Sequence, residues 1–360
     1  MTGKRDIHNG RGYTVLGIMS GTSLDGLDIA YCKFKELDRG WDYKICRADT
    51  IKYTGIWKEK LESAYYRDKG TLADLDLEYG EFIGTSINRF LEGGQKPDLI
   101  ASHGHTVLHR PDLGYSLQVG DGGRIAGLTG ITTIYDFRSE DIRNGGQGAP
   151  LVPVGDRDLF SEFAGCLNLG GFSNISFDRK GKRIAFDICP VNIILNEYAV
   201  ELGQEFDGDG ELGRKGQVVP RLLEKLNKLE YYRHIGPGSL GKEWLLSHFK
   251  PVLESSNHTP ENILRTLYEH IAIQISAVLN LDIDGKVLVT GGGSHNKFLV
   301  ELLDSMSGTE LIIPDDTLVN FKESLIFAYL GLLRYLGRNN CLASVTGARS
   351  DSMGGKIIFV

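Results

Sequence analysis

The sequence has few cysteines and no long run of apolar residues. Its 360 residues include only five cysteines, at Cys32, Cys46, Cys166, Cys189 and Cys341, and no CxxC pair. An odd number of unpaired cysteines predicts reduced thiols in a cytosolic protein. No segment approaches the ~18 apolar residues that a membrane span requires. The first residues also lack the apolar core of a signal peptide. We therefore expect a cytoplasmic protein without membrane contact.

An excess of positive charge is also missing. Lys and Arg number 40 against 47 Asp and Glu, which gives a formal net charge of −7. No basic stripe is available for a nucleic-acid backbone or an anionic membrane surface. Hydrophobic residues make up 41% and charged residues 24%, which is an ordinary globular composition and excludes a disordered chain. The expected partners are small molecules rather than nucleic acid.

Glycine, in contrast, is abundant, with 46 residues against only 10 prolines. Without a collagen or linker period, this density predicts many turns in which the backbone closely approaches something else. Short β-branched runs end at such glycines. They alternate with helical periodicity over residues 57–92, 193–202, 259–281 and 322–336. Strands alternating with helices predict an α/β protein whose sheets are covered by helices.

The chain length predicts two domains. We place them at residues 1–160 and 161–360, and the last helix is a candidate to pack back on the first lobe. Both halves open in the same way, with a strand, a glycine turn, a second strand and a later strand that ends in an acidic residue. This pattern is a weak internal repeat.

Recurring glycine turns are the strongest local signal. The first, SGTSLDGLD at residues 20–28, has small residues that leave backbone N–H groups open and hydroxyls that add donors. A phosphate could bind there without a lysine, although such a turn by itself is more often just a hairpin. It matches neither standard nucleotide fingerprint. Similar turns at 168–174 and 290–296 favour a nucleotide held between two lobes, as in actin-like sugar kinases.

Acidic residues follow several predicted strands, at Asp25, Asp28, Asp136 and Asp187. Phosphoryl transfer needs a metal to bridge the phosphates and a carboxylate to accept a proton from the nucleophile. Aspartates in loops also cap helices and close Asx turns. Asp187 differs from the others because an apolar strand leads into it and Pro190 restricts the turn that follows. It is the candidate general base.

The histidines at 105 and 109 have the HxxxH spacing of a metal site on a helix. Thr106 and Val107 are β-branched and Pro111 follows, which disfavours a helix there. No Cys or Glu ligand lies nearby. These histidines are therefore expected to form hydrogen bonds with substrate or backbone.

The polar segment 136–148 contains glycines that favour a shaped ligand site. The guanidinium of Arg138 suits a carboxylate-bearing substrate. The alternative is a structural ion pair of Arg138 with Asp136, Glu140 or Asp141.

Several segments together resemble the anhydro-N-acetylmuramic acid kinase family. In chain order they read SGTSLDGLD, SHGHTVLHRP, YDFRSEDIRNGGQGAPLVP, NLGGFSNIS, FDICPVN, GGGSHN, KESLIFAYL and SVTGA. The resemblance extends from about residue 15 to the end of the chain. It implies a two-lobed actin-like (ribonuclease H-like) sugar kinase fold with a nucleotide cleft between the lobes. It also implies ATP and Mg²⁺ as cofactors and a cytosolic homodimer.

The resemblance further implies the reaction. Family members hydrolyse the 1,6-anhydro bond of 1,6-anhydro-N-acetylmuramic acid and phosphorylate O6, which yields N-acetylmuramic acid 6-phosphate for cell-wall recycling. Asp187 then corresponds to the catalytic base. The expected substrate residues are His103, Asp136, Arg138, Gln147 and Glu323. The expected nucleotide-binding residues are Gly21, Thr22, Ser23, Leu24, Asp25, Gly26, Leu27, Asp28, Gly170, Gly171, Asn174, Gly291, Gly292, Gly293 and Asn296. No residue is assigned as a direct metal ligand.

Several motifs depart from the family pattern, and two of them concern the expected site. The family's FDTGPGN is here FDICPVN, so Ile188, Cys189 and Val191 replace a hydroxyl residue and two glycines. This side of the cleft is expected to be bulkier and more apolar. The family's HGQTV is here HGHTV, with His105 in place of glutamine. A second hypothesis is therefore a nucleotide or sugar sensor that has lost turnover, and a third is a metal-dependent transferase that uses His105 and His109.

Overall fold

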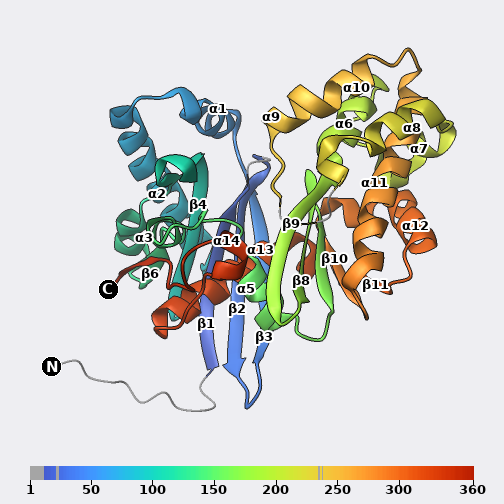
Figure 1. Cartoon of the computed structure of the whole chain (residues 1–360). Coiled ribbons are helices and arrows are strands. Elements are labelled where there is room, and N and C mark those ends of the chain that lie inside the picture. Colours follow the sequence, from blue (N-terminus) through green and yellow to red (C-terminus); the bar gives the residue numbers. More distant parts are fainter. Residues whose placement is uncertain (1–11, 22–23, 234–235, 237) are drawn as a thin grey trace. The chain divides into compact units, whose positions relative to one another are not determined.

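The computed structural model describes residues 12–21, 24–233, 236 and 238–360. The chain divides into two compact units, and Figure 1 shows that each contains a sheet and helices. Unit 1 is formed by Met1–Leu159 and Phe321–Val360, and unit 2 by Phe160–Asn320. The α/β class expected from the sequence is confirmed. The predicted lobes were 1–160 and 161–360. They differ from these units because residues 321–360 belong to unit 1 and not to the second half.

The core of unit 1 is a seven-stranded mixed sheet. Its strands are β1 (Gly12–Ser20), β2 (Gly26–Glu36), β3 (Trp41–Lys52), β4 (Leu99–Arg110), β5 (Tyr115–Val119), β6 (Thr133–Tyr135) and β12 (Lys356–Ile358). Strands β1, β2 and β3 pair antiparallel, whereas β4 runs parallel to β1 and β6 runs parallel to β4. Strand β12 pairs antiparallel with β6 and forms the edge of the sheet.

Helices pack on this sheet. They are α1 (Gly55–Ser63), α2 (Lys69–Phe90), α3 (Gly122–Thr129), α4 (Ser139–Arg143), α5 (Pro153–Leu159), α13 (Asp316–Tyr335) and α14 (Ala343–Thr346), with short 3-10 turns η1 (Ala64–Tyr66) and η2 (Pro111–Leu113). Helix α2 begins after Asp68, whose carboxylate accepts the N–H groups of Gly70 and Thr71. This N-cap satisfies two of the donors that a helix start leaves free.

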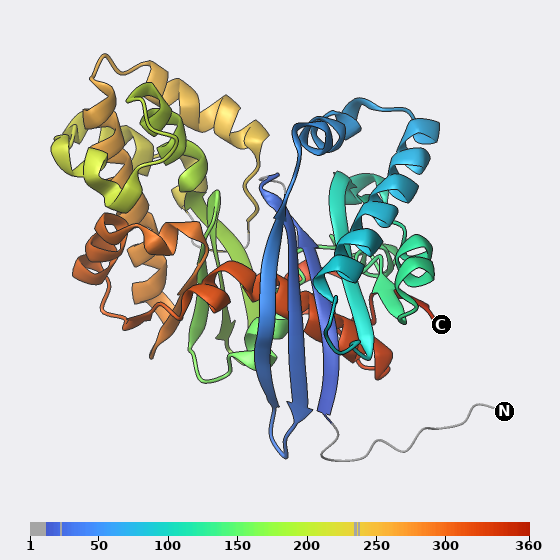
Figure 2. The ribbon, with the colours of Figure 1, turned by 180° about the vertical axis from the view of Figure 1, so that it is seen from behind.

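Contacts between α13 and the sheet explain why residues 321–360 belong to unit 1 (Figure 2). A Cβ atom on Gly17 of β1 would lie 1.9 Å from the carbonyl oxygen of Ser324. A Cβ on Gly331 of α13 would lie 2.4 Å from the Cβ of Ala101 in β4. The two glycines therefore let the helix and strand backbones approach closely, and the buried residues Leu325 and Leu330 complete the packing.

Unit 2 is built on a five-stranded sheet. Its strands are β7 (Gly165–Leu169), β8 (Phe172–Arg179), β9 (Lys182–Pro190), β10 (Val287–Thr290) and β11 (Leu311–Ile312). Their order is β11-β10-β7-β8-β9, which reproduces β6-β4-β1-β2-β3 of unit 1. The directions match as well, since β7, β8 and β9 pair antiparallel whereas β10 and β11 pair parallel. The strand, glycine turn and strand that open both halves are thus confirmed as a repeat. The acidic residues are not part of it, because Asp187 lies in β9, the counterpart of β3, whereas Asp136 follows β6.

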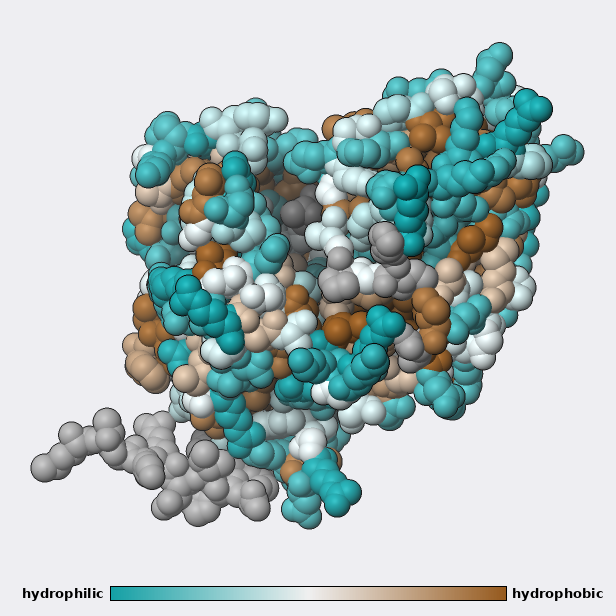
Figure 3. Space-filling model, viewed as in Figure 1, coloured by the Kyte–Doolittle hydropathy of each residue, from teal (hydrophilic) through white to brown (hydrophobic). Residues whose placement is uncertain are grey.

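The helices of unit 2 bury a second hydrophobic core. They are α6 (Asn192–Glu201), α7 (Glu211–Lys215), α8 (Pro220–Asn227), α9 (Lys242–Trp244), α10 (Lys250–Glu254), α11 (Pro260–Asp282) and α12 (Lys297–Met306), with short turns η3 (Gly208–Gly210), η4 (Glu230–Arg233), η5 (Leu245–Phe249) and η6 (Gly292–His295). Leu264, Ile271 and Ile275 of α11 are fully buried at helical spacing. Hydrophilic side chains cover most of the visible face of each unit (Figure 3).

Several elements differ from the sequence prediction. The predicted strand 98–102 continues to Arg110, so His103 and His105 lie within β4 rather than after it. Asp187 likewise lies inside β9. Strand β3 was not predicted, although Trp41, Tyr43 and Ile45 alternate with polar residues at the spacing of a strand, because none of its residues is fully buried. In the described part of the chain, no helix is long and apolar enough to cross a bilayer.

Candidate active site

Asp187 is held in position by a segment that lies far away in the sequence. One carboxylate oxygen, Oδ2, accepts the backbone N–H of Leu240 at 2.8 Å and the hydroxyl of Ser239 at 3.3 Å. The Asp187 backbone N–H donates to the Gly238 carbonyl at 3.0 Å. The other oxygen, Oδ1, has no hydrogen-bond partner among the described residues. One oxygen is therefore anchored and the other is left to accept a proton.

The surroundings of Asp187 favour a base. Burial raises the pKa of its carboxyl group, and the Leu240 N–H and Ser239 hydroxyl partly oppose that shift. The residue borders a small recess of about 20 Å³, which is also lined by Tyr231, Tyr232 and Gln274. A carboxylate with a raised pKa binds a proton more strongly than an exposed one. The geometry fits the predicted general base.

The three residues that depart from the family pattern beside Asp187 have different places. Cys189 and Val191 are fully buried in the hydrophobic core of unit 2, so they add no bulk to the binding surface. Ile188 is 4% exposed and lines the recess beside Asp187, so the expected apolar character is found at this position. A β-bulge lies here: Ser173 faces Cys189, the next pair is Asn174 with Asp187, and Ile188 is the extra residue between them. A bulge changes which side chains face each side of a sheet.

Asp187 is the last member of a polar row across the sheet of unit 2. Thr290 on β10 pairs with Asn168 on β7, Asn168 pairs with Asn174 on β8, and Asn174 pairs with Asp187 on β9. Directly opposed residues project from the same face of a sheet. The amides of Asn168 and Asn174 form no hydrogen bond with the described residues. The analysis of the sequence selected Asn174 but missed Asn168, which mirrors it across the NLGGFSN hairpin.

The first glycine turn connects β1 and β2 in unit 1. Leu24 has a positive φ of 59°, and a Cβ on Gly26 would lie 2.7 Å from the Ile51 carbonyl oxygen, so the turn is tight. Leu27 is fully buried in the core, so its side chain cannot contact a nucleotide. Asp25 is exposed and Gly21 is half-buried. The predicted residues Thr22 and Ser23 lie outside the described part of the chain.

Asp28 lies on β2, just after this turn. Its Oδ1 accepts the hydroxyl of Thr50 on β3 at 2.6 Å. Burial raises the pKa of Asp28, the Thr50 hydrogen bond lowers it, and the neighbouring Asp25 raises it further. Its second carboxylate oxygen has no partner among the described residues and is available to a ligand.

A buried hydrogen-bond network supports the start of the first turn, and the sequence analysis missed it. The hydroxyl of Ser20 lies 2.7 Å from the Tyr53 hydroxyl and 2.9 Å from Nδ1 of His105, and Tyr53 in turn bonds to Tyr79. All four residues are buried. Desolvation lowers the pKa of His105 to about 4. The family's glutamine is thus replaced by a neutral imidazole at pH 7.

The same contacts give both histidines of the metal-dependent hypothesis structural partners. His105 and His109 lie on a strand, where His105 bonds to Ser20 and His109 bonds to Ser116. Across the described residues, no group of three or more His, Cys, Asp and Glu side chains is arranged to hold a metal ion.

The second glycine turn is tied to helix α6. The carbonyl of Gly171 accepts the N–H groups of Val191 and Ile193, and the carbonyl of Gly170 accepts that of Asn192. The side chain of Asn192 donates to the Leu169 carbonyl at 3.0 Å. These bonds satisfy donors at the start of α6. They also fix the hairpin beside Asn174.

The third turn combines glycines that packing requires with one that is exposed. A Cβ on Gly291 would lie 2.6 Å from Oδ1 of Asn168, and one on Gly293 would lie 2.9 Å from the Cβ of Leu169. Packing therefore requires glycine at both positions, whereas Gly292 is exposed. Asn296 is also structural, because its Oδ1 caps α12 at Leu299 N. Its amide nitrogen donates to the Asp207 carbonyl and the Tyr268 hydroxyl.

In unit 1, Arg138 bonds to His103 instead of the acidic residues beside it. Its Nε and Nη2 donate to His103 Nε2 at 3.0 and 2.8 Å, and Nη1 donates to the Gly148 carbonyl at 2.7 Å. Desolvation lowers the pKa of Arg138 to about 10, so the guanidinium is charged at neutral pH. The proposed ion pair with Asp136, Glu140 or Asp141 does not form.

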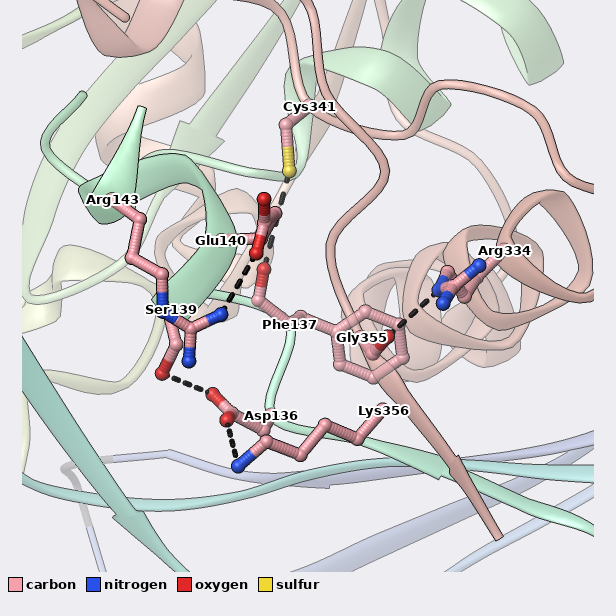
Figure 4. Close-up of polar contacts among 9 residues, drawn as sticks. All are labelled: Asp136, Phe137, Ser139, Glu140, Arg143, Arg334, Cys341, Gly355 and Lys356. Atoms are coloured by element: carbon pink, nitrogen blue, oxygen red, sulfur yellow. Dashed lines mark hydrogen bonds and ion pairs between the residues drawn. The ribbon is translucent and has the colours of Figure 1, made fainter. Parts of the chain in front are cut away.

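Asp136 is occupied by structural contacts (Figure 4). Its carboxylate accepts the Ser139 hydroxyl at 2.6 Å and pairs with Lys356 of β12 at 2.9 Å. Glu140 pairs with Arg143 in α4. Asp136 thus anchors the C-terminal strand to the end of β6, which argues against a direct substrate contact.

The glycine-rich loop after α4 is shaped by the C-terminal segment. The carboxylate of Asp141, which is fully buried, accepts the Gly148 N–H and the Thr346 hydroxyl, each at 2.8 Å. The Gln147 N–H donates to the Thr346 carbonyl at 2.9 Å. The side chain of Gln147 is exposed and has no partner among the described residues, so it remains a substrate candidate.

Glu323 of α13 is the remaining predicted substrate residue. Its side chain is exposed and forms no ion pair or hydrogen bond within the described residues. Desolvation raises the pKa of its carboxyl group, and the charges of Lys322 and Arg138 partly oppose that shift. Lys322 itself pairs with Asp156 at 2.8 Å. The carboxylate of Glu323 is therefore left for a ligand.

Two units with the same order and direction of strands, each with glycine turns at strand ends, define the actin-like (ribonuclease H-like) class of sugar kinases. A family model described as anhydro-N-acetylmuramic acid kinase matches residues 13–360. The chain belongs to this family.

Named relatives agree with the family model. A protein of Colwellia psychrerythraea is 34% identical over 391 aligned positions and covers 98% of each chain. A protein of Hydrogenovibrio crunogenus is 32% identical and covers 95% of this chain and 97% of its own. Both are named anhydro-N-acetylmuramic acid kinase. A glucokinase structure from Streptomyces griseus aligns with only 11% identity and a TM-score of 0.40, over 88% of this chain and 98% of its own.

Proposed function

We propose that this protein uses ATP to open the 1,6-anhydro bond of 1,6-anhydro-N-acetylmuramic acid and to phosphorylate the freed O6. The product is N-acetylmuramic acid 6-phosphate, an intermediate of cell-wall recycling. Membership of the kinase family supports this assignment. The observation that carries it is the carboxylate of Asp187, which has one anchored oxygen, one free oxygen and a pKa raised by burial.

Asp187 acts as the general base. Its free Oδ1 takes a proton from water while the water oxygen bonds to the anomeric carbon. The bond from that carbon to O6 breaks, and O6 accepts the γ-phosphoryl group of ATP as the bond between the β- and γ-phosphates breaks and ADP leaves. The Leu240 N–H holds the second oxygen and so keeps the carboxylate oriented throughout. A positioned general base of this kind contributes typically 10²–10⁴-fold to a rate.

The glycine turns are the proposed ATP-binding segments. Unit 1 contributes the first turn, with Gly21, Leu24 and Asp25 beside its exposed surface. Unit 2 contributes Gly170, Gly171 and Gly292. Open backbone N–H groups at such turns suit phosphate oxygens.

The carboxylates of unit 1 fit Mg²⁺, because Asp28 and Glu323 each have an oxygen without a partner in the described part of the chain. Mg²⁺ is usually held by one or two carboxylates together with phosphate oxygens and water. When bound, it would neutralise charge on the transferring phosphoryl group.

Arg138 is the proposed ligand of the lactyl carboxylate, the group that distinguishes the muramic sugar from its glucosamine counterpart. The alternative of a sensor without turnover rested on a crowded surface beside Asp187. Cys189 and Val191, whose bulk suggested this surface, are instead fully buried core residues, so that reason is removed.

Direct detection of the product tests the proposed function. The protein is incubated with ATP, Mg²⁺ and 1,6-anhydro-N-acetylmuramic acid, and the sugar is analysed by mass spectrometry. A mass gain equal to water plus one phosphoryl group is expected. A gain of phosphoryl alone, or no change, would contradict the proposed reaction.

Replacing Arg138→Lys should raise the KM for the sugar about tenfold or more. Charge-assisted hydrogen bonds contribute on the order of 1.5–3 kcal/mol, and lysine cannot offer the same two parallel donors. The KM for ATP should change little. Arg143→Lys is the matched control, because Arg143 is exposed and pairs only with Glu140. A lower melting temperature with an unchanged sugar KM would instead indicate a structural role for Arg138.

The pH profile should show the environment of Asp187. A general base works in its deprotonated form, and burial raises the pKa of Asp187, so kcat should fall on the acidic side at a pH above the ordinary aspartate range of about 3.9. Ser239→Ala removes a hydrogen bond that lowers this pKa, so the acid limb should move to higher pH. Ser247→Ala, an exposed serine of η5, is the control and should leave it in place.

A further inference from the structure

Arg138 and His103 form a pair with an unusual shape. The N–H groups of Nε and Nη2, which share one edge of the guanidinium, both point at Nε2 of His103, at 3.0 and 2.8 Å. His103 lies on β4 and is only 3% exposed. The whole edge of the guanidinium is therefore occupied by a single nitrogen acceptor.

The hydrogen bonds determine the tautomer of His103. Since Nε2 accepts from Arg138, it carries no proton, and Nδ1 must be the protonated nitrogen. Nδ1 lies 2.9 Å from the Gly104 carbonyl, to which it donates. Burial and the charge of Arg138 both lower the pKa of His103 well below its usual value. The imidazole is neutral, and it acts as an acceptor toward the guanidinium.

The imidazole ring is fixed on more than one side. Its centroid lies 4.5 Å from that of Phe327 on α13. The donor bond to Gly104 restrains the ring at Nδ1, and Gly104 itself has a positive φ of 72°. The position of Nε2 is therefore fixed, and Nε2 in turn fixes the edge of the guanidinium that bonds to it.

Arg138 keeps a second pair of donors. A guanidinium has five N–H groups, and His103 with the Gly148 carbonyl accounts for three of them. The two that remain belong to Nη1 and Nη2, one on each nitrogen. Both are available as donors to the oxygens of a carboxylate.

We propose that His103 is a positioning residue that selects for the lactyl carboxylate of the substrate by directing the Nη1 and Nη2 end of Arg138 toward it. This inference rests on the proposed function and replaces the expectation that His103 contacts the sugar itself. Removing the acceptor leaves the guanidinium free to turn and lowers its preference for a carboxylate. The charge of Arg138 is unchanged, so the effect is on orientation.

The test compares His103→Phe, which keeps a ring beside Phe327 but has no acceptor, with His103→Gln, whose amide oxygen can accept. His109→Gln is the control, because His109 is exposed on the same strand and bonds only to Ser116. The sugars are 1,6-anhydro-N-acetylmuramic acid and 1,6-anhydro-N-acetylglucosamine, which lacks the lactyl group. Kinetics and calorimetric binding are measured for both.

His103→Phe should raise the KM and Kd for the muramic sugar about tenfold or more, the equivalent of one charge-assisted hydrogen bond. Its kcat, its KM for ATP and its binding of the glucosamine sugar should change little. His103→Gln should recover part of the loss. In an Arg138→Lys background, His103→Phe should add little further loss. Equal losses for both sugars, or a full additional loss in that background, would overturn the proposal.

A further measurement does not depend on turnover. In protein labelled with ¹⁵N-histidine, the His103 signal, identified by its absence in His103→Gln, should show a protonated Nδ1 and an unprotonated Nε2. A proton on Nε2 would refute the positioning role even if the enzyme were active. Wild-type protein that shows the expected tautomer but does not phosphorylate the muramic sugar would instead refute the proposed function.

Discussion

Asp187→Asn is expected to lower kcat for the anhydro sugar by roughly 10²–10⁴-fold or more, because the amide cannot take the proton of the attacking water. The KM for ATP should change little, since Asp187 is proposed to contact the water and not the nucleotide. Steady-state kinetics with both substrates measures this directly. Unchanged turnover would remove Asp187 from the mechanism.

The same variant should not be destabilised at neutral pH. Burial raises the folded-state pKa of Asp187, so the charged carboxylate costs stability at every pH above that value. A neutral amide removes this cost and can still accept the Leu240 N–H. Thermal unfolding at pH 7 should give an equal or higher melting temperature. Asp284→Asn, at an exposed position before β10, is the control for both measurements.

Gly17→Ala is expected to destabilise unit 1 by about 3 kcal/mol, the upper part of the usual range for overpacking. The new Cβ would lie 1.9 Å from the Ser324 carbonyl oxygen and 2.8 Å from its carbon. These are backbone atoms of α13, so the helix as a whole has to shift. For a unit of this size, the melting temperature should fall by roughly 6–12 °C.

Gly12→Ala provides the matched control on the same strand. Its Cβ would meet only the Phe34 carbonyl oxygen at 3.8 Å, which is an ordinary contact. The two variants add the same methyl group to β1. Equal melting temperatures in a thermal unfolding experiment would show that α13 does not pack on Gly17 as described.

The place of each side chain around the site depended on contacts between distant segments. Leu240 holds Asp187 from 53 positions away, and His103 lies 35 positions from Arg138. Neither pair shares a local pattern in the sequence. The sequence did point to Arg138 as a candidate, but three acidic neighbours made a local ion pair an equally natural hypothesis. Only the fold shows that those neighbours are occupied by Lys356, Arg143 and Thr346.

The sequence by itself determined the α/β class, the internal repeat, the glycine turns and the acidic residue that follows an apolar strand, because these depend on residue type and spacing along the chain. Tertiary structure decided which turn residues can face a ligand. Leu27 is buried in the core, and packing leaves no room for a side chain at Gly291 and Gly293. The tertiary structure also placed Cys189 and Val191 in the core. The physical reason is that successive side chains of a strand point to opposite faces of the sheet. One extra residue at a bulge therefore moves the side chains that follow it to the other face, and no local sequence pattern predicts where a bulge forms.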